Sequence, residues 1–323
     1  MTSLTGNLLG SLQEELSRYR GKRVFFEHLE GNNGDKLIEM GAKAILRSND
    51  TKLVSNPQWA EVIIINGGAG MTDIWGHGFK KLQKYNSVYP QTPLIILPSS
   101  FVFTETDFAS LFRERIAPAF VYARECYSLK ILQDLIFPGD VRLGIDHDMA
   151  FQLQNTPYMQ KLQSQKAQKH ILIVERNDPE SVTEQYQAKQ SNSINKYIPW
   201  SVKRPIKQHI IWPIKRIKIA KLVQELGLNT VFAQQHIQQI LTDHPDLQGL
   251  PIYAADISNP EFCDFNSFGQ LIAESAVVVA TRLHVGILAA MLNKTTYIKS
   301  GSYHKIRGIY EYSLVNQANV QLI

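Results

Sequence analysis

The sequence predicts an α/β protein built from two doubly wound, Rossmann-like domains that face a cleft. The chain has 323 residues, and two domains are expected because single hydrophobic cores stop growing near about 250–300 residues. Short apolar runs alternate with amphipathic stretches along the chain, which is typical of parallel strands covered by helices on both faces. A polar, glutamine-rich stretch at 150–168 interrupts this alternation, and we interpret it as an interdomain linker.

The first domain is expected to span residues 1–155. Amphipathic stretches at 35–47 and 125–135 predict helices between its strands. The apolar runs that predict the strands are VFFEHL (24–29), VIIIN (62–66), LIILP (94–98), AFVYA (119–123) and VRLG (141–144).

The second domain is expected to span residues 165–323 and to repeat the same alternation. Its final segment, YHKIRGIYEY (303–312), has a helical pattern and could pack back toward the cleft. The predicted strands are HILIVER (170–176), NTVFA (229–233), PIYAAD (251–256), VVVA (277–280) and TTYI (295–298).

Composition and charge narrow the class of protein. The formal net charge of +5 favours an anionic ligand or surface but is too small to indicate nucleic acid. Cys126 and Cys263 are far apart and form neither a disulfide framework nor a zinc motif, as expected in a reducing cytosol. We find no signal-peptide pattern and no run of about 18 apolar residues, so we expect a cytoplasmic protein.

In doubly wound sheets, ligands bind beyond the C-terminal ends of the strands. Two glycine-rich loops occupy such positions, GNNGD (31–35) and GGAG (67–70). Glycine lets backbone N–H groups approach a ligand, and Asp35 falls in a first helical turn, where a carboxylate is favourable. Neither loop matches a dinucleotide or P-loop motif. They are either ligand-binding loops or tight turns with a capping aspartate.

Two arginines and a histidine also follow predicted strands of the second domain. Arg176 ends one strand, and Arg282 and His284 follow another. The arginine fork matches carboxylates and phosphates, so this pair could bind a ligand with two anionic groups. His284 is a natural proton carrier near neutral pH. Alternatively, the arginines pair with local carboxylates, for which Asp178 and Glu180 are candidates.

Two further features have more than one interpretation. Arg124 follows the fourth strand and could serve either the cleft or an interdomain salt bridge. The run DHD (146–148) has the composition of a metal site. Side chains alternate along an extended strand, however, so three adjacent residues cannot all face one ion. We therefore predict no metal.

Taken together, these motifs resemble those of the polysaccharide pyruvyl transferase family. A closing segment, SGSYHKIRGIYE (300–311), also resembles the end of the family pattern, and the resemblance covers about residues 24–311 in order. The matching pieces are GNNGDKLI (31–38), GGAGMTDIW (67–75), PSS (98–100), ARECYSLKIL (123–132), DMAF (148–151), RNDPE (176–180) and TRLHVGILAA (281–290).

The resemblance implies a fold like that of GT-B glycosyltransferases. It also implies transfer of the pyruvate unit of phosphoenolpyruvate onto two sugar hydroxyls, as a cyclic ketal, without a cofactor. The donor would be bound by Arg176, Arg282 and His284, with Lys305 and Gly301 beside them. Catalysis would use His284, Arg282, Arg176 and Asp35, and either His284 or Lys305 would deliver a proton to the methylene carbon of the donor.

The first domain is expected to bind the glycan acceptor. A base must take the proton of the attacking hydroxyl, and Asp35, Asp73 and Asp146 are candidates from their positions on loops. The sequence departs from the family at Val285, where a second glycine is common, and in the second glycine loop. The predicted acceptor residues are Asn32, Asn33, Asp35, Gly68, Asp73, Arg124 and Asp146.

A basic segment at 196–221 contains several Lys and Arg residues together with Trp and Ile. Its prolines prevent one continuous helix, and its composition suits an anionic membrane surface. This would fit a lipid-linked acceptor and a location at the inner face of the plasma membrane. The alternative is an interdomain loop or a flap over the cleft. We do not expect nucleic-acid binding, because the patch is local.

Two other functions remain open from the sequence. A nucleotide-sugar glycosyltransferase of the GT-B type would use the same arginines on a diphosphate. A non-catalytic member of the family would bind an anionic glycan or partner other enzymes of exopolysaccharide synthesis.

Overall fold

The computed structural model describes residues 8–165, 168–176 and 231–323. Within it the chain forms two compact units. The first consists of Met1–Gly31, Asp35–Tyr158 and His304–Asn316, and the second of Asn32–Gly34, Met159–Tyr303 and Gln317–Ile323. The basic segment at 196–221 lies outside the described residues, as do Asp178 and Glu180.

The first unit is built on a six-stranded sheet in the order β2-β1-β3-β4-β5-β6, and all of its strand pairs are parallel. Each expected strand of this unit is present, and the short edge strand β2 adds one that was not expected. The strands are β1 (Arg23–Glu27), β2 (Lys52–Val54), β3 (Val62–Ile65), β4 (Leu94–Ser99), β5 (Ala119–Ala123) and β6 (Val141–Ile145).

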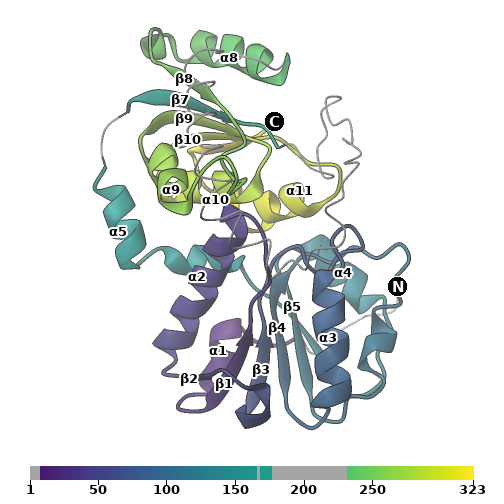
Figure 1. Ribbon diagram of the computed structural model, residues 1–323. Helices are drawn as coiled ribbons and strands as arrows, with labels where there is room; N and C mark the ends of the chain where they lie inside the picture. Colours follow the sequence, from purple (N-terminus) through teal and green to yellow (C-terminus); the bar gives the residue numbers. More distant parts are fainter. Residues whose placement is uncertain (1–7, 166–167, 177–230) are drawn as a thin grey trace, which may run out of the picture. The chain divides into compact units, whose positions relative to one another are not determined.

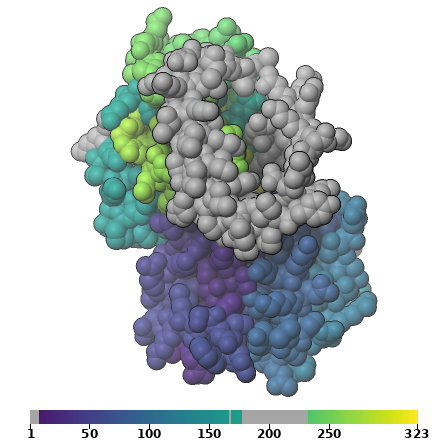
Figure 2. All heavy atoms as spheres, viewed as in Figure 1, coloured from purple at the N-terminus to yellow at the C-terminus, as the bar shows by residue number. Residues whose placement is uncertain are grey.

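Helices cover both faces of this sheet because neighbouring residues of its strands point to opposite faces. Ile63 packs in one buried cluster with α3 (His77–Val88) and α4 (Cys126–Gln133). Val62 and Ile64 pack in the other with α1 (Leu12–Ser17) and α2 (Asn33–Ser48). The strands of this sheet, drawn in Figure 1, are covered by other atoms of the unit in the space-filling view of Figure 2.

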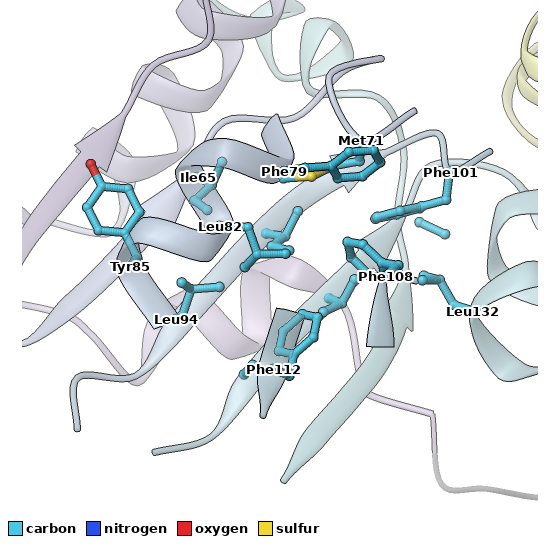
Figure 3. Packing of buried hydrophobic residues seen from close by; sticks show 14 of the residues in the cluster. Ile65, Met71, Phe79, Leu82, Tyr85, Leu94, Phe101, Phe108, Phe112 and Leu132 are labelled. Carbon is cyan, nitrogen blue, oxygen red and sulfur yellow. The ribbon is translucent and has the colours of Figure 1, made fainter. Parts of the chain in front are cut away.

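The face covered by α3 and α4 has an aromatic core. Phe108 stacks on Phe103 with ring centroids 4.7 Å apart and meets Phe112 edge-on at 5.4 Å. Figure 3 shows Phe108 and Phe112 in the same buried cluster as Phe101, Phe79 and Met71. Aromatic side chains bury large areas, so this cluster fixes the loops that follow β3 and β4.

The second unit is built on a five-stranded sheet in the order β11-β10-β9-β7-β8, again with parallel pairs throughout. On one face, α8 (Val231–Asp243) packs its Phe232 and Ile237 against the sheet. On the other face lie α9 (Phe265–Ala273) and α10 (Leu283–Met291) (Figure 1). The strands are β7 (His170–Val174), β8 (Ile252–Ala254), β9 (Ser275–Ala280), β10 (Thr295–Ile298) and β11 (Val320–Leu322).

One predicted strand is wrong. The run NTVFA (229–233) was expected to be a strand, but helix α8 begins at Val231. Phe232 is buried, and so are Ala233, Ile237 and Ile240, whose successive spacings of four and three residues are those of a helix face. A half-buried strand would alternate buried and exposed residues, whereas here Phe232 and Ala233 are both buried and the next two residues are exposed.

The remaining elements connect the sheets. The glutamine-rich stretch predicted to be a linker contains η3 (Met149–Leu153) and α5 (Pro157–Gln163). The final segment forms α11 (Lys305–Ile309), followed by a π-helix at Tyr310–Leu314. Single 3₁₀ turns complete the structure at η1 (Pro57–Trp59), η2 (Ala109–Phe112) and η6 (Pro245–Leu247).

Both sheets are therefore doubly wound, as the sequence predicts, whereas the GT-B arrangement stays a prediction. Each sheet has one point where consecutive strands are added on opposite sides of an earlier strand. In the first unit this point lies between β1 and β3, and in the second between β7 and β9. Ligands of open α/β sheets bind at such switch points, beyond the C-terminal ends of the strands.

No helix in the described part of the chain is long and apolar enough to cross a membrane.

At Gly41, helix α2 approaches the backbone of Met149 so closely that a larger residue cannot fit. A Cβ atom there would lie 1.7 Å from the backbone oxygen of Met149. We expect Gly41→Ala to destabilise the first unit by at least about 2 kcal/mol through overpacking, although alanine is the better helix former. Urea unfolding measures this. Gly10→Ala is the control, because its Cβ would meet only the flexible carboxylate of Glu14. Equal stability of the two variants would contradict the prediction.

Candidate functional site

Arg176 and Arg282 occupy equivalent positions on two paired strands. Val174 of β7 lies opposite Ala280 of β9 in the parallel register, and each arginine comes two residues later. Both side chains are 7% exposed. The structure thus brings the two predicted arginines to the switch point of the second sheet.

Arg282 forms a two-pronged ion pair with Asp256, a partner that the sequence did not predict. Its Nε donates to Oδ1 over 3.0 Å, and its Nη2 donates to Oδ2 over 2.5 Å. Asp256 follows β8, on the far side of β7 from β9. The side chain of Arg282 must therefore pass over the end of β7, where Arg176 begins.

Thr281 fixes the two arginines to the sheet. Its hydroxyl accepts a hydrogen bond from the backbone N–H of Arg176 over 2.7 Å. Its own backbone N–H donates to the carbonyl oxygen of Val174 over 2.9 Å. The backbone positions from which the two arginines extend are therefore tied together.

His284 lies in the first turn of α10 and is the one residue of this helix that is not buried. The other eight residues of α10 pack inside the unit. Gly34 lies directly against His284. A Cβ atom on Gly34 would be 2.7 Å from the imidazole Nδ1 and 2.8 Å from the Cβ of His284. Only glycine allows this close approach.

Asn33 anchors this glycine loop to the loop that follows β8. Its side-chain amide donates to the carbonyl oxygens of Ile257 and Cys263 over 3.0 and 2.9 Å. Its backbone N–H donates to the carbonyl oxygen of Ser258 over 2.9 Å. Asn33 is fully buried, and its predicted part in acceptor binding stays a prediction. Asn32 accepts a hydrogen bond from the N–H of Gly34 over 2.7 Å.

The two glycine loops meet in the first unit, at the switch point between β1 and β3. The carboxylate of Asp35 folds back over Gly31, where a Cβ would lie 1.9 Å from Oδ2. Its other oxygen is 3.9 Å from the position of a Cβ on Gly68. Gly68 has φ +124°, in a region that favours glycine. Asp35 and Gly68, both predicted site residues, are thus neighbours.

Asp73 and Asp146, which are also candidate bases, accept hydrogen bonds within the first unit. Burial alone would raise the pKa of Asp73, but hydrogen bonds from Thr106, Glu105 and Thr104 outweigh it and hold that pKa far below its usual range. Asp146 accepts from the backbone N–H groups of Leu12 and His147, each over 2.7 Å.

Arg124 is fully buried and pairs with Asp148 inside the first unit. Its Nη1 donates to Oδ2 of Asp148 over 2.6 Å, and its Nε donates to the hydroxyl of Ser100 over 2.9 Å. Its Nη2 is buried and makes no hydrogen bond. Removing one partner of such a pair costs about 3–5 kcal/mol because it leaves a buried charge uncompensated, so we expect neither residue to be replaceable alone.

The predicted donor residues fall in different units. Gly301 follows β10 in the second unit, whereas Lys305 begins α11 and belongs to the first unit. Lys305 is 7% exposed. The preceding residue, His304, has its Nε2 3.4 Å from Oε1 of the buried Glu125. This pair attaches the start of α11 to α4.

Sequence reasoning missed Asp256, Asp148 and the Glu125–His304 pair as partners. Each carboxylate followed a predicted strand or began a predicted helix, which is a weak signal. The pairing depends on the strand order, which one sequence does not provide. In the described part of the chain, no group of three or more His, Cys, Asp and Glu side chains could hold a metal ion.

The role of Asn33 can be tested by a charge-introducing change. We expect Asn33→Asp to lower the free energy of unfolding by about 3 kcal/mol or more, because a carboxylate would face the carbonyl oxygens of Ile257 and Cys263. Chemical unfolding is the measurement. Asn32→Asp is the matched control, since aspartate keeps the oxygen that accepts from Gly34, and we expect less than about 1 kcal/mol. A stable Asn33→Asp protein would refute the anchoring role.

Comparison with known proteins identifies the family. No curated protein matches the chain. Among solved structures, a functional uncharacterized protein, KP1_0663, from Klebsiella pneumoniae subsp. pneumoniae NTUH-K2044 has a TM-score of 0.60 and 19% sequence identity, with 96% of each chain covered. This likeness concerns the fold alone. The family model for polysaccharide pyruvyl transferase matches residues 13–302. The chain therefore belongs to the polysaccharide pyruvyl transferase family.

Proposed function

We propose that the protein transfers the pyruvate unit of phosphoenolpyruvate onto a pair of sugar hydroxyls, forming a cyclic ketal and releasing phosphate. The acceptor would be a precursor of an exopolysaccharide or cell-wall glycan. Membership in the family supports the class of reaction. The donor and the ketal product are our inference.

The paired positions of Arg176 and Arg282 are the observation that carries this proposal. Phosphoenolpyruvate has a carboxylate and a phosphate on a three-carbon frame. Two guanidinium groups extending from neighbouring strands match a small ligand with two anionic groups. Gly301 follows the next strand, β10, where the absence of a side chain would leave room for the donor.

His284 is the proposed acid. Its imidazolium would deliver a proton to the methylene carbon of phosphoenolpyruvate, which makes C2 cationic. A sugar hydroxyl then attacks C2 and gives its proton to a base. The bond between C2 and the phosphate oxygen breaks, and the second hydroxyl closes the ketal as its proton leaves. No step requires a metal or a cofactor.

Asp35 is the proposed base on the acceptor side. The low pKa of Asp73 makes that carboxylate a weak base at neutral pH. Asp35, the last residue of the first glycine loop, lies next to Gly68 of the second loop at the switch point of the first unit, where ligands of such sheets bind. We propose that Asn32, Gly68 and Asp35 contact the acceptor there.

The acceptor is proposed to be a lipid-linked oligosaccharide, used in the cytoplasm at the inner face of the plasma membrane. The basic segment 196–221, which would contact anionic lipid, is outside the described residues. This part of the proposal rests on its composition alone.

A thermal-shift titration with phosphoenolpyruvate tests the donor. A ligand that binds only the folded state raises the free energy of unfolding, by about 2.7 kcal/mol at one hundred times its Kd, and therefore raises the melting temperature. We expect phosphoenolpyruvate to raise it in the wild type but not in Arg282→Ala. Stabilisation only by UDP-sugars or GDP-sugars would replace this proposal with a nucleotide-sugar glycosyltransferase. Binding of glycans without any turnover would indicate a non-catalytic member.

The contact between Gly34 and His284 gives a second test. We expect Gly34→Ala to weaken phosphoenolpyruvate binding about tenfold, the loss typical of one hydrogen bond to a charged group. The new methyl group would clash with both the ring and the Cβ of His284, so rotation of the ring alone cannot relieve the clash. Titration of the melting temperature measures the affinity. Gly10→Ala is the control, and unchanged affinity in Gly34→Ala would contradict the role of His284.

A further inference from the structure

We propose that Asp256 is a positioning residue for the donor. It would hold the guanidinium of Arg282 beside Arg176 in the orientation that binds the anionic groups. The inference rests on the proposed function, because it assigns Asp256 a role in binding phosphoenolpyruvate. It adds a residue that the sequence reasoning placed in no role.

The first argument is the reach of Arg282. Strand order places β7 between β9, which leads to Arg282, and β8, which leads to Asp256. Neighbouring strands lie about 4.8 Å apart, so the two backbones are separated by roughly 10 Å. Arg282 must extend across the end of β7 to form its two hydrogen bonds of 3.0 and 2.5 Å. A two-pronged pair fixes the plane of the guanidinium as well as its position.

The second argument is that Asp256 is itself held firmly. The preceding residue, Ala255, donates its N–H to Ile173 of β7 over 3.1 Å, and the carbonyl oxygen of Asp256 accepts from Asn259 over 3.1 Å. The next residue, Ile257, accepts from the buried amide of Asn33. The carboxylate thus extends from a backbone that is tied on both sides.

The third argument is electrostatic. Arg176 and Arg282 carry like charges at equivalent positions of paired strands, and each residue is only 7% exposed. Like charges repel, and burial strengthens the repulsion. The carboxylate of Asp256, itself 8% exposed, offsets one of these charges. Without it, Arg282 would gain by turning toward water and away from Arg176.

Charge and orientation predict opposite effects on donor affinity. Asp256→Asn removes a negative charge next to an anion site, so electrostatics alone predicts tighter binding of phosphoenolpyruvate. Asparagine offers only one oxygen, however, and its amide nitrogen cannot accept from the guanidinium. A positioning role therefore predicts weaker binding despite the gain in positive charge.

The experiment measures the Kd of phosphoenolpyruvate on the full chain by calorimetry, with melting temperatures to verify folding. We expect Asp256→Asn to weaken binding about tenfold or more. Asp256→Glu keeps the charge but moves it by one methylene, and we expect it to weaken binding as well. The matched control is Asp243→Asn, which makes the same change at an exposed residue of α8 and should alter the Kd less than twofold.

A double-mutant cycle separates positioning from general loss of structure. The second background is Arg282→Lys, which keeps a positive charge but not the two-pronged fork, so that a Kd can still be measured. If Asp256 acts through the orientation of the Arg282 guanidinium, Asp256→Asn has a much smaller effect on the Kd in this background than in the wild type. Unchanged or tighter binding in Asp256→Asn overturns the proposal, and so does an equal loss in both backgrounds. If Asp256→Asn does not fold, the cycle is run with Asp256→Glu. A wild type that binds UDP-glucose or GDP-mannose but not phosphoenolpyruvate would refute the proposed function instead, and the same cycle with that ligand would still test Asp256.

Discussion

In each unit, the position of the candidate site residues depends on one topological constraint, which both sheets have. In each unit the chain adds one strand beside an early strand and the next strand on its other side, so two connections leave the C-terminal edge in opposite directions. The opening between them is where backbone N–H groups and side chains can face a ligand. Asp35 and Gly68 lie at this point in the first unit, and Arg176 and Arg282 lie there in the second. The predicted residues are neighbours because of strand order.

The sequence predicted the interior of both sheets well because continuous apolar runs such as Ile63–Ile65 have little alternative to a buried strand. It failed where the local signal was short or mixed. β2 and β11 have three residues each and lie at sheet edges, and Val231–Ala233 has strand-forming residues at the start of a helix. The candidate site residues were predicted from their positions after strands, and their roles stay predictions. Their partners, Asp256 and Asp148, were not predicted, because pairing between strand ends requires knowing which strands are neighbours: β8 and β9 are consecutive in the sequence but lie on opposite sides of β7.

The two buried arginine pairs differ in what they can do. Arg124 is wholly enclosed with Asp148 and Ser100, and its Nη2 remains without a hydrogen bond. A ligand cannot reach such a group without rearrangement, and the pair's effect is on the stability of the first sheet. Arg282 keeps a small exposure next to Arg176. An arginine that is oriented by a carboxylate yet borders solvent is organised in advance for an anion, so less side-chain entropy is lost on binding.

The first glycine motif is used in a way that its sequence did not indicate. Gly31 and Asp35 belong to the first unit, whereas Asn32–Gly34 belong to the second. Asn33 is hydrogen-bonded to the loop after β8, and Gly34 lies directly against His284. Each residue type therefore has its own physical reason. The amide of Asn33 donates to two carbonyl oxygens, the missing side chain of Gly34 leaves room for the imidazole of His284, and the carboxylate of Asp35 lies next to the second glycine loop. The motif thus combines three separate physical constraints within five residues, and it is one of the ordered set of motifs on which the family resemblance rests.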